Sequence, residues 1–590
     1  MRTRAVGLLS AAMVLGGLLA SAATPASAQT GGLAPFAAYG NGEAIVLNAL
    51  SLGTSQLAGL RVAASGGSVN SNATGLTPIT NEFGQNVGPA RADKNAYGRG
   101  TAIEAGVLTA TPQPVDLNQL ILAGLAEAFA PPPSDLVTKD IPIPVNPLLF
   151  ASTARGQAQA TFDPRFCPIG RPITFGRGFV ENLELLGSQT APDGSILDPL
   201  LGTSVTTGTD RATTQSRTVT YVVSNGDGTF GVVSETRQTV APITVGALGG
   251  AGGLGGLQIE IAGEFGLRVV ATGKPGGASA QYTGNPLITI RTVTAGIPVD
   301  VVGPITLQQL IGQNGIGLDL GLLSLSVGQP PRALGGALNS TPALAPDGTS
   351  ASAAVDLLNV NVGGQTVPLL DLGVAHMEGA VTVPAGGLKC TIPVSKVASV
   401  DPVTVGNEFQ YIIKIPSDAA LFSSLFNCDL VGISAVDRVT TESGNPRIQL
   451  VSASNGGVIS GNTVTFPNLG NYVLGQEPIT VTITARIPGS SGAGVLRDTV
   501  DVSAALGNCR GTGVAGSDII QGSAQIPGIA RLDGTAITGN VTLLGPNVTR
   551  GDLAATGGNS WPLVAGGGFL LAALGLVRLR RQVNEVPTRT

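Results

Sequence analysis

A strict two-residue alternation of β-branched and polar side chains constrains this chain most, because only a half-buried strand has that period. The alternation is plainest at residues 479–487, which read ITVTITARI, and it recurs at residues 408–415. Further strand-like runs, separated by turn residues, lie at residues 446–453, 458–466, 496–504 and 516–523. About seven short strands in such a stretch are typical of an immunoglobulin-like sandwich. The sequence therefore predicts one over residues 395–525.

Residues 29–394 form a larger region that we also expect to be rich in β-strands. Residues 217–223 and 229–233 flank the turn NGDG at 225–228, which predicts a hairpin. Residues 257–270 and 287–293 add strands. Asp116 and the prolines at 131–133 predict a helix over residues 117–130, and a shorter helix is expected after Pro304. The predicted fold class is mainly β, with one or two short helices in this region.

Three segments in the larger region resemble one another: YGNG at 39–42, YGRG at 97–100 and FGRG at 175–178. We interpret them as a structural repeat in which glycines turn the chain beneath an aromatic ring. None continues into G-x-G-x-x-G before a helix, so dinucleotide binding is a poor interpretation.

The N-terminus is typical of a secretory signal peptide. Arg2 and Arg4 precede an apolar stretch at residues 6–19, and the small residues at 26–28 predict cleavage between Ala28 and Gln29. An uncleaved membrane anchor is the alternative, but the apolar stretch is short for one.

The C-terminus has three parts in a fixed order. The sequence LAATG is followed by an apolar run at residues 561–577 and then by a basic cluster. The run is long enough as a helix, at about 25 Å, to just cross a bilayer core. The basic cluster would stop transfer on the cytoplasmic side; it consists of Arg578, Arg580 and Arg581.

This tail resembles the sorting signal of Gram-positive surface proteins, in the L-A-x-T-G variant of actinobacteria. In that family, sortase cuts between Thr and Gly and joins the Thr carbonyl to a peptidoglycan amine. The resemblance implies a cut between Thr556 and Gly557, with this chain as substrate. The matching motif is Leu553, Ala554, Ala555, Thr556 and Gly557. It would place residues 526–552 as a wall-spanning linker and residues 553–590 as the sorting signal.

Charge and cysteine content agree with export. Residues 29–556 contain 26 basic and 36 acidic residues, which argues against nucleic acid as a partner. The scarcity of lysine agrees with a high-GC, actinobacterial genome. The even number of cysteines favours disulfides. Three pairings are possible; we favour Cys428–Cys509, because both lie in the predicted sandwich, and Cys167–Cys390 then follows.

Residues 395–525 also resemble the Ig-like repeats of bacterial surface proteins, which usually act as stalks. The matching segments are Lys396, DPVTVG at 401–406, VSAS at 451–454, GNTVTF at 461–466, the strand at 479–487 and DTV at 498–500. Pilin-like Ig domains can carry Lys–Asn isopeptide bonds. The resemblance therefore suggests Lys396 and Asn508 as the candidate pair for such a bond.

The whole layout resembles the choice-of-anchor G family of bacterial surface proteins. The residues that suggest it are AYGNGEA at 38–44, ARGQA at 154–158 and FCP at 166–168 with GRG at 176–178. The family implies a secreted region joined to a C-terminal anchor, and it implies no activity.

Motifs for catalysis are scarce. His376 is the single histidine, so a Ser-His-Asp triad would need it. No G-x-S-x-G, H-E-x-x-H or zinc-ligand spacing occurs, and we expect no cofactor and no metal. The preferred hypothesis is a wall-anchored structural or adhesive protein with an unknown extracellular ligand. The alternatives are a wall-displayed hydrolase that uses carboxylates in residues 29–394, and a membrane-tethered ectodomain that sortase does not process.

Overall fold

The structure is a computed structural model and describes residues 33–544 with gaps, the longest at 106–120, 142–148, 186–200, 204–212, 246–255, 363–369 and 510–530. The described part is mainly β, as the sequence predicts, with two short helices. The predicted signal peptide, the sorting motif and the apolar run at 561–577 lie outside it. Within the described residues, no helix is both long and apolar enough to cross a membrane.

The first of the sheets in the described part has 11 strands and joins segments that are far apart in sequence. β1 (Ala37–Leu52) pairs antiparallel with β27 (Leu370–Thr382) on one side and with β3 (Leu60–Asn70) on the other. The remaining strands, from one edge to the other, are β23 (Ile316–Asp319), β24 (Leu323–Val327), β26 (Ser350–Val362), β6 (Ala96–Ala105) and β7 (Ile121–Ala123), with β2 (Ser55–Leu57), β25 (Ala343–Leu344) and β8 (Ala126–Ala130) beside β1, β26 and β6.

A second and a third sheet together form one long layer. The chain passes from a strand of one sheet into a strand of the other with only a short interruption, at residues 240–242 and at residues 263–264. The second sheet contains β20 (Ser279–Thr283), β19 (Phe265–Ala271), β16 (Thr229–Thr239), β15 (Thr213–Ser224), β12 (Thr174–Glu181), β11 (Thr153–Ala160) and β9 (Val137–Ile141), with β28 (Leu388–Lys389) beside β16. The third contains β10 (Leu149–Phe150), β13 (Glu184–Leu185), β14 (Leu201–Thr203), β17 (Ile243–Val245), β18 (Leu257–Ala262), β21 (Leu287–Thr294) and β22 (Ile297–Thr306).

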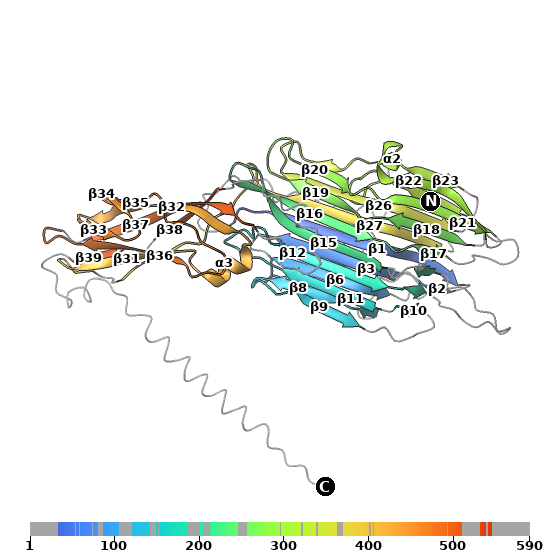
Figure 1. Cartoon of the computed structure of the whole chain (residues 1–590), viewed down its shortest axis with the longest axis horizontal. Helices are drawn as coiled ribbons and strands as arrows, with labels where there is room; N and C mark the ends of the chain where they lie inside the picture. Colours follow the sequence, from blue (N-terminus) through green and yellow to red (C-terminus); the bar gives the residue numbers. More distant parts are fainter. Residues whose placement is uncertain are drawn as a thin grey trace, which may run out of the picture.

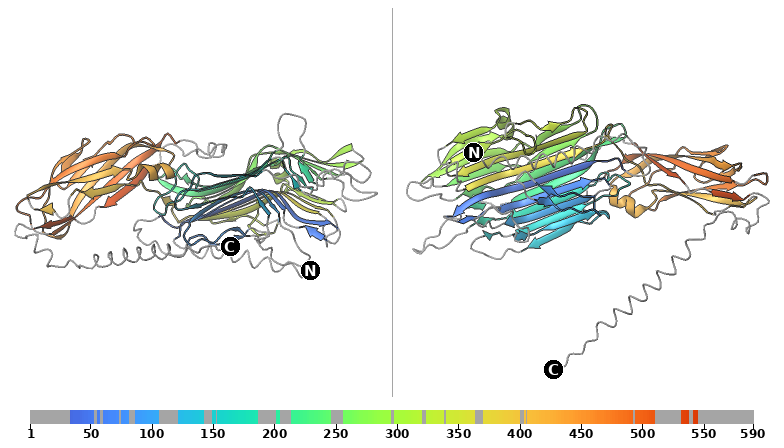
Figure 2. Two further views of the ribbon diagram at one scale, coloured as in Figure 1. Left: turned by 90° about the horizontal axis from the view of Figure 1, so that it is seen from below. Right: turned by 180° about the vertical axis from the view of Figure 1, so that it is seen from behind.

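The second sheet packs face to face on the first, so this region is a two-layered sandwich (Figure 2). β12 and β15 lie against β3, and β16 lies against β1 and β27. The predicted hairpin is confirmed as β15 and β16, and the strands expected at 257–270 and 287–293 are β18, β19 and β21. A small separate sheet pairs β4 (Ile79–Thr80) with β5 (Asn86–Gly88).

The three aromatic–glycine segments lie inside β1, β6 and β12. They do repeat one structural feature, but the predicted turn is wrong, because the glycines face the opposite sheet from strand interiors. A Cβ on Gly100 would lie 2.1 Å from the backbone oxygen of Arg177, and one on Gly176 would lie 1.9 Å from that of Arg99. Stacked sheets ordinarily lie about 10 Å apart. Here the two backbones touch, which only glycine allows.

The helix predicted over residues 117–130 is wrong from residue 121 onward, and residues 117–120 lie outside the described part. β7 and β8 occupy this stretch and pair with β6. In β8, buried and more exposed positions alternate, which is the strand period and not the helical one. The second predicted helix is confirmed as α2 (Leu307–Gly312), with a capping box between Thr306 and Gln309.

Two further sheets, with strands from residue 395 onward, form the sandwich predicted as immunoglobulin-like. One contains β29 (Ser395–Ala398), β31 (Glu408–Ile415), β36 (Ile479–Arg486) and β33 (Gln449–Ala453). The other contains β30 (Val403–Thr404), β39 (Val541–Leu544), β37 (Gly494–Gly507), β32 (Asp429–Gly444), β35 (Thr463–Phe466) and β34 (Val458–Ser460), with β38 (Arg531–Ile537) beside β37. We call this the smaller sandwich, and the sheets before it the larger sandwich.

Most strands expected in the smaller sandwich are confirmed, and the run at 516–523 lies outside the described residues. α3 (Ala419–Leu425), capped by Asp418, was not predicted. Residues 531–544, which the sequence analysis assigned to the linker, form β38 and β39 on β37.

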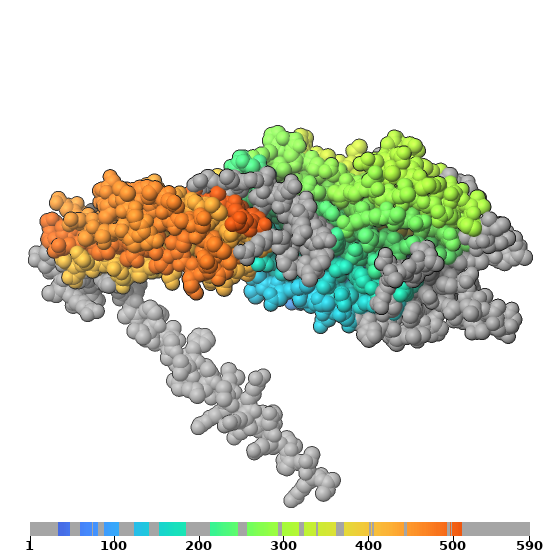
Figure 3. Space-filling model, in the orientation of Figure 1, coloured from blue at the N-terminus to red at the C-terminus, as the bar shows by residue number. Residues whose placement is uncertain are grey.

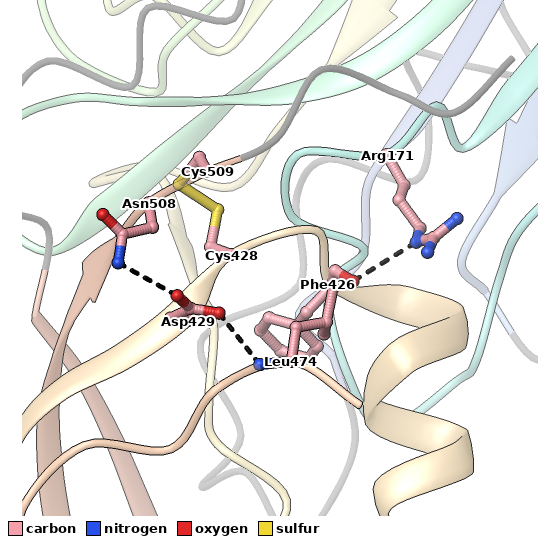
Figure 4. Close-up of a disulfide and its surroundings, with 7 residues drawn as sticks. All are labelled: Arg171, Phe426, Cys428, Asp429, Leu474, Asn508 and Cys509. Carbon is pink, nitrogen blue, oxygen red and sulfur yellow. Dashed lines mark hydrogen bonds between the residues drawn. A yellow bond between two sulfur atoms is a disulfide. The ribbon is translucent and has the colours of Figure 1, made fainter. Parts of the chain in front are cut away.

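The two sandwiches meet end to end, as Figures 1 and 3 show. The disulfides are Cys167–Cys390 and Cys428–Cys509, which is the pairing that the sequence analysis favoured. Between Cys167 and Cys428, the backbone of Ile169 bonds to Leu425 and Asn427 on the smaller sandwich. Arg171 Nε donates to the carbonyl oxygen of Phe426 at 3.2 Å (Figure 4). The junction is therefore held by backbone pairing with a disulfide on each side.

Candidate functional site

A lysine and two aspartates lie together inside the smaller sandwich. Lys396 comes from β29, Asp437 from β32 and Asp498 from β37, and all three side chains are 0% exposed. Lys396 Nζ contacts Oδ2 of both carboxylates. It also lies 4.7 Å from the centroid of the Tyr411 ring, whose face attracts a cation. The cluster bridges the two sheets at the centre of the core.

Strand alternation explains why these charged residues point inward. Asp437 occupies the middle of a buried series in β32, between Ala435 and Val439. Asp498 occupies a similar series in β37, between Leu496 and Val500, and it stands directly opposite Val439 in the antiparallel ladder. Because a strand has a period of two, these positions face the core whatever residue occupies them.

The electrostatics of the cluster favour one neutral carboxyl group. Burial raises the pKa of Asp498 to about 7; the attraction of Lys396 opposes this, and the nearby Asp437 adds to it. Burial also raises the pKa of Asp437 against the pull of Lys396. The two carboxyl groups are hydrogen-bonded to each other. Two carboxylates that share one site and one ammonium hold one proton between them.

Such an arrangement can form an amide. A neutral carboxyl carbon is electrophilic, and a buried amine next to it is a nucleophile once it loses its extra proton. A second carboxylate can take that proton. Enclosure in a dry core holds the reacting groups together and excludes competing water.

The pairing of Lys396 with Asn508 considered from the sequence is wrong. Asn508 Nδ2 donates to Asp429 Oδ2 at 3.0 Å, at the junction end of β32, beside the Cys428–Cys509 disulfide (Figure 4). The other oxygen of Asp429 accepts from the backbone N–H of Leu474 at 2.8 Å. Asn508 therefore helps to hold the junction, and Asp498 occupies the place beside the lysine.

His376, the residue that a catalytic triad would need, is buried in the first sheet among charged groups. Its Nδ1 lies 2.7 Å from Asp356 Oδ1 and its Nε2 lies 2.9 Å from Glu378 Oε1. Arg332 also bonds to Asp356, and the Tyr39 hydroxyl donates to Glu378 at 2.6 Å. Both ring nitrogens thus face carboxylates, which leaves neither of them to activate a hydroxyl nucleophile.

The other predicted site residues lie outside the residues that the structure describes. The cleavage site at Ala28 and Gln29, the motif at 553–557 and the arginines at 578, 580 and 581 are not described. Among the residues that are described, no three His, Cys, Asp or Glu side chains gather as metal ligands.

Sequence reasoning missed Asp437 and Asp498, although each leaves a local signal. Each aspartate stands at an inward position of an alternating apolar strand, where a charge is costly unless it is paired. Searching inward strand positions for charged residues would have found both. It would not have matched them to Lys396, which is 41 residues before the first.

No family model matches the chain, and no curated protein does. Among solved structures it is similar to BcpA, the major pilin subunit of Bacillus cereus, at 9% identity over 46% of this chain and 58% of that one, with a TM-score of 0.16. The N-terminal domain of the Streptococcus gordonii adhesin Sgo0707 matches at 9% identity over 57% and 86%, with a TM-score of 0.15. A putative membrane anchored protein from Corynebacterium diphtheriae matches at 9% over 70% and 98%, also with 0.15. The match to BcpA thus covers under two thirds of the pilin.

Proposed function

We propose that this chain is an exported, wall-anchored surface protein with a structural or adhesive role and no catalysis of its own, and that an amide bond between Lys396 and Asp498 cross-links its smaller sandwich. The larger sandwich would be displayed outward by the smaller one. Sortase would act on the chain at Thr556 and join it to peptidoglycan. The N-terminal signal, the LAATG motif and the basic end support this route.

The observation that carries the proposal is the fully buried contact of Lys396 with two carboxyl groups. A free buried ion triad is weak evidence for stability, because desolvation of the charges offsets their attraction. A covalent bond removes that cost, since both charges disappear. In the chain-entropy model, a link that closes a loop of about 100 residues stabilises by about 5 kcal/mol. It would also tie the first strand of the sandwich to a strand of the opposite sheet.

The reaction balances without any added reagent. The Lys396 ammonium passes one proton to the Asp437 carboxylate, and its nitrogen then attacks Cγ of the neutral Asp498 carboxyl group. The Nζ–Cγ bond forms, the Cγ–OH bond breaks, and one water leaves. Asp437 ends with the spare proton, so the net change is an ammonium and a carboxylate becoming an amide and water.

Mass spectrometry of the purified, folded chain tests the cross-link. After reduction of the disulfides, the intact mass is expected to be lower than the sequence mass by one water. Proteolysis should then release a branched peptide that joins Lys396 to Asp498. Lys396→Arg should restore the full mass, whereas the matched control Lys414→Arg, on the exposed face of β31, should keep the deficit. An unbranched Lys396 peptide from folded wild-type chain would refute the cross-link without depending on any variant.

Anchoring has a separate test. The C-terminal peptide of wall material released by muramidase from the native host should end at Thr556 and carry a wall-peptide adduct. An intact tail through Thr590, extracted by detergent alone, would instead support the membrane-tethered alternative.

A further inference from the structure

Three arginines stand directly opposite one another on the outer face of the second sheet. The antiparallel ladders pair Arg177 on β12 with Arg217 on β15, and Arg217 with Arg237 on β16. The neighbouring glycines Gly176 and Gly178 face the first sheet, so the arginines face away from it. Like charges in directly opposed positions destabilise a sheet, so this row needs compensation.

Two of the three have carboxylate partners. Arg217 and Arg237 both bond to Glu264, and Arg237 Nε also bonds to Glu235 at 2.6 Å. On the next strands, Arg268 lies 3.8 Å from Glu235, and Arg155 pairs with Asp140. Each arginine in and beside the row except Arg177 therefore has a carboxylate partner, although the five arginines have these three carboxylates between them.

Arg177 is the exception. No carboxylate of the described residues lies within ion-pair distance of it, and its bonds go only to glutamine oxygens. Its Nε and Nη2 donate to Gln215 Oε1 at 3.1 and 2.7 Å, and Nη1 donates to Gln157 Oε1 at 3.4 Å. Burial, Arg217 and Arg155 all lower its pKa, so its surroundings disfavour the charge that it carries.

The remaining donors of Arg177 are suited to an anion. A guanidinium has five N–H groups, and three are used by the two glutamines, which also hold the side chain in place. One N–H of Nη1 and one of Nη2 remain, and they can donate to the oxygens of a carboxylate. The side chain is only half-buried, so a ligand can reach it.

We infer that Arg177, Gln157 and Gln215 form a binding site for one carboxylate of an acidic carbohydrate. Apart from Arg177, positive charges here are already paired, so the site suits a single carboxylate at a time and not a dense polyanion. The surrounding side chains favour a sugar over an acidic peptide. The amide of Gln215 and the hydroxyl of Thr138, which accepts from Gln157 Nε2 at 3.3 Å, can bond to sugar hydroxyls. The half-buried ring of Phe179, 5.4 Å from the Arg177 guanidinium, offers a flat apolar surface beside them.

This site would give the adhesive role a ligand class, and in that sense it rests on the proposed function. Its test is independent, however, because binding in solution requires neither anchoring nor the Lys396 cross-link. A chain that lacks the cross-link but binds sugar would contradict only the earlier proposal.

Isothermal titration of the purified full chain with tetragalacturonic acid tests the site. The fully methyl-esterified tetramer is the matched neutral probe, because esterification removes the charges and adds only one methyl group to each carboxyl group. We expect the acid to bind and the ester to bind at least about tenfold more weakly, as the loss of a charge-assisted hydrogen-bond pair implies. Arg177→Gln should weaken binding of the acid to the same degree. Arg438→Gln, which removes an exposed arginine of the smaller sandwich, should leave it unchanged.

Four outcomes would overturn the inference. Equal binding of the acid and its ester would exclude carboxylate recognition. Unchanged binding by folded Arg177→Gln would place the site elsewhere, and circular dichroism of that variant would establish that it is folded. If tetraglutamate bound as tightly as tetragalacturonate, the site would bind any carboxylate and would not select a carbohydrate. Absence of binding by the acid would refute the site altogether.

Discussion

The two sandwiches fill the space between their sheets in opposite ways. In the larger one, the first and second sheets meet through glycines and small hydroxyl side chains, and the strand backbones touch. In the smaller one, the interior holds large rings such as Phe422, Phe426 and Tyr472, which pack on each other within 5.3 Å. It also encloses the charged cluster around Lys396.

The two interiors therefore accommodate different kinds of buried polar side chain. Close contact in the larger sandwich favours short hydroxyls that bond to one another across the layers, with the amide of Gln238 on β16 donating to the backbone oxygen of His376 on β27 at 3.0 Å. Ser65 on β3 bonds to Ser216 and Thr218 on β15, each at 2.8 Å. The wider smaller sandwich can hold long charged side chains, which must pair or react because water does not reach them. The larger interior therefore depends on the close fit of its two sheets, and the smaller interior depends on the pairing or reaction of its buried charges.

The largest expected effect comes from breaking the shape-dependent interior. Gly100→Val places a branched side chain where even a Cβ would lie 2.1 Å from a backbone oxygen. Neither sheet can yield without losing its ladder, so we expect the larger sandwich not to fold, with a loss above about 4 kcal/mol. Calorimetry should show one missing transition, and the transition of the smaller sandwich should remain.

A matched control is available within the same region. Gly303 on β22 has no atom within 4 Å of an added Cβ, and Gly303→Ala should leave both transitions in place. If Gly100→Val melted like wild type, the contact between the two backbones would be refuted.

The next largest effect tests the charged cluster around His376 in the larger sandwich. His376→Ala leaves Asp356 and Glu378 buried without their shared partner, which should cost about 3–5 kcal/mol. Burial works to raise the pKa of Asp356, but His376 and Arg332 outweigh it and hold the pKa well below its usual range. A depressed folded-state pKa gives stability that is present above the unfolded pKa of about 3.9 and is lost as the pH falls.

The variant should therefore begin to unfold at a higher pH than wild type during acid titration. Far-ultraviolet circular dichroism measures this transition. Asp135→Asn, at an exposed position between β8 and β9, serves as the control and should not move the acid transition. Equal acid transitions for His376→Ala and wild type would argue that the cluster adds nothing to stability.

The sequence predicts the strands of both sandwiches well, because alternation is local. It fails where the deciding contact is distant. Residues 121–130 are apolar on nearly every side, which suits a buried helix, yet pairing with β6 makes them strands. The glycine segments carry no local sign of the sheet that they face. Asp437 and Asp498 are brought to Lys396 only by the register of β32 on β37, and no motif encodes that register.

The disulfides allow a smaller test of how the sandwiches are joined. Replacing Cys167 and Cys390 by serine opens a link between residues 223 apart, and replacing Cys428 and Cys509 opens one between residues 81 apart. Each change should cost about 2–4 kcal/mol. We expect the first pair to lower the melting temperature of the larger sandwich and the second to lower that of the smaller one. If either pair lowered both transitions equally, the two sandwiches would be one cooperative unit.

The smallest expected effect tests the reaction proposed for the charged cluster of the smaller sandwich. If Asp498 reacts as the neutral acid, the cross-linking rate should follow its protonated fraction, and burial raises its pKa to about 7. To follow the reaction, the chain is recovered unfolded from inclusion bodies and refolded. Cross-linking, seen as the loss of one water, should then be about tenfold slower at pH 8 than at pH 6, because the neutral fraction of the Asp498 carboxyl group falls by that factor. Intact mass at successive times measures the rate. Asp501→Asn, an exposed carboxylate on the same strand, should leave the profile unchanged. A rate that rises with pH would mean that loss of the lysine proton limits the reaction, and Asp437 would then not be the group that accepts it.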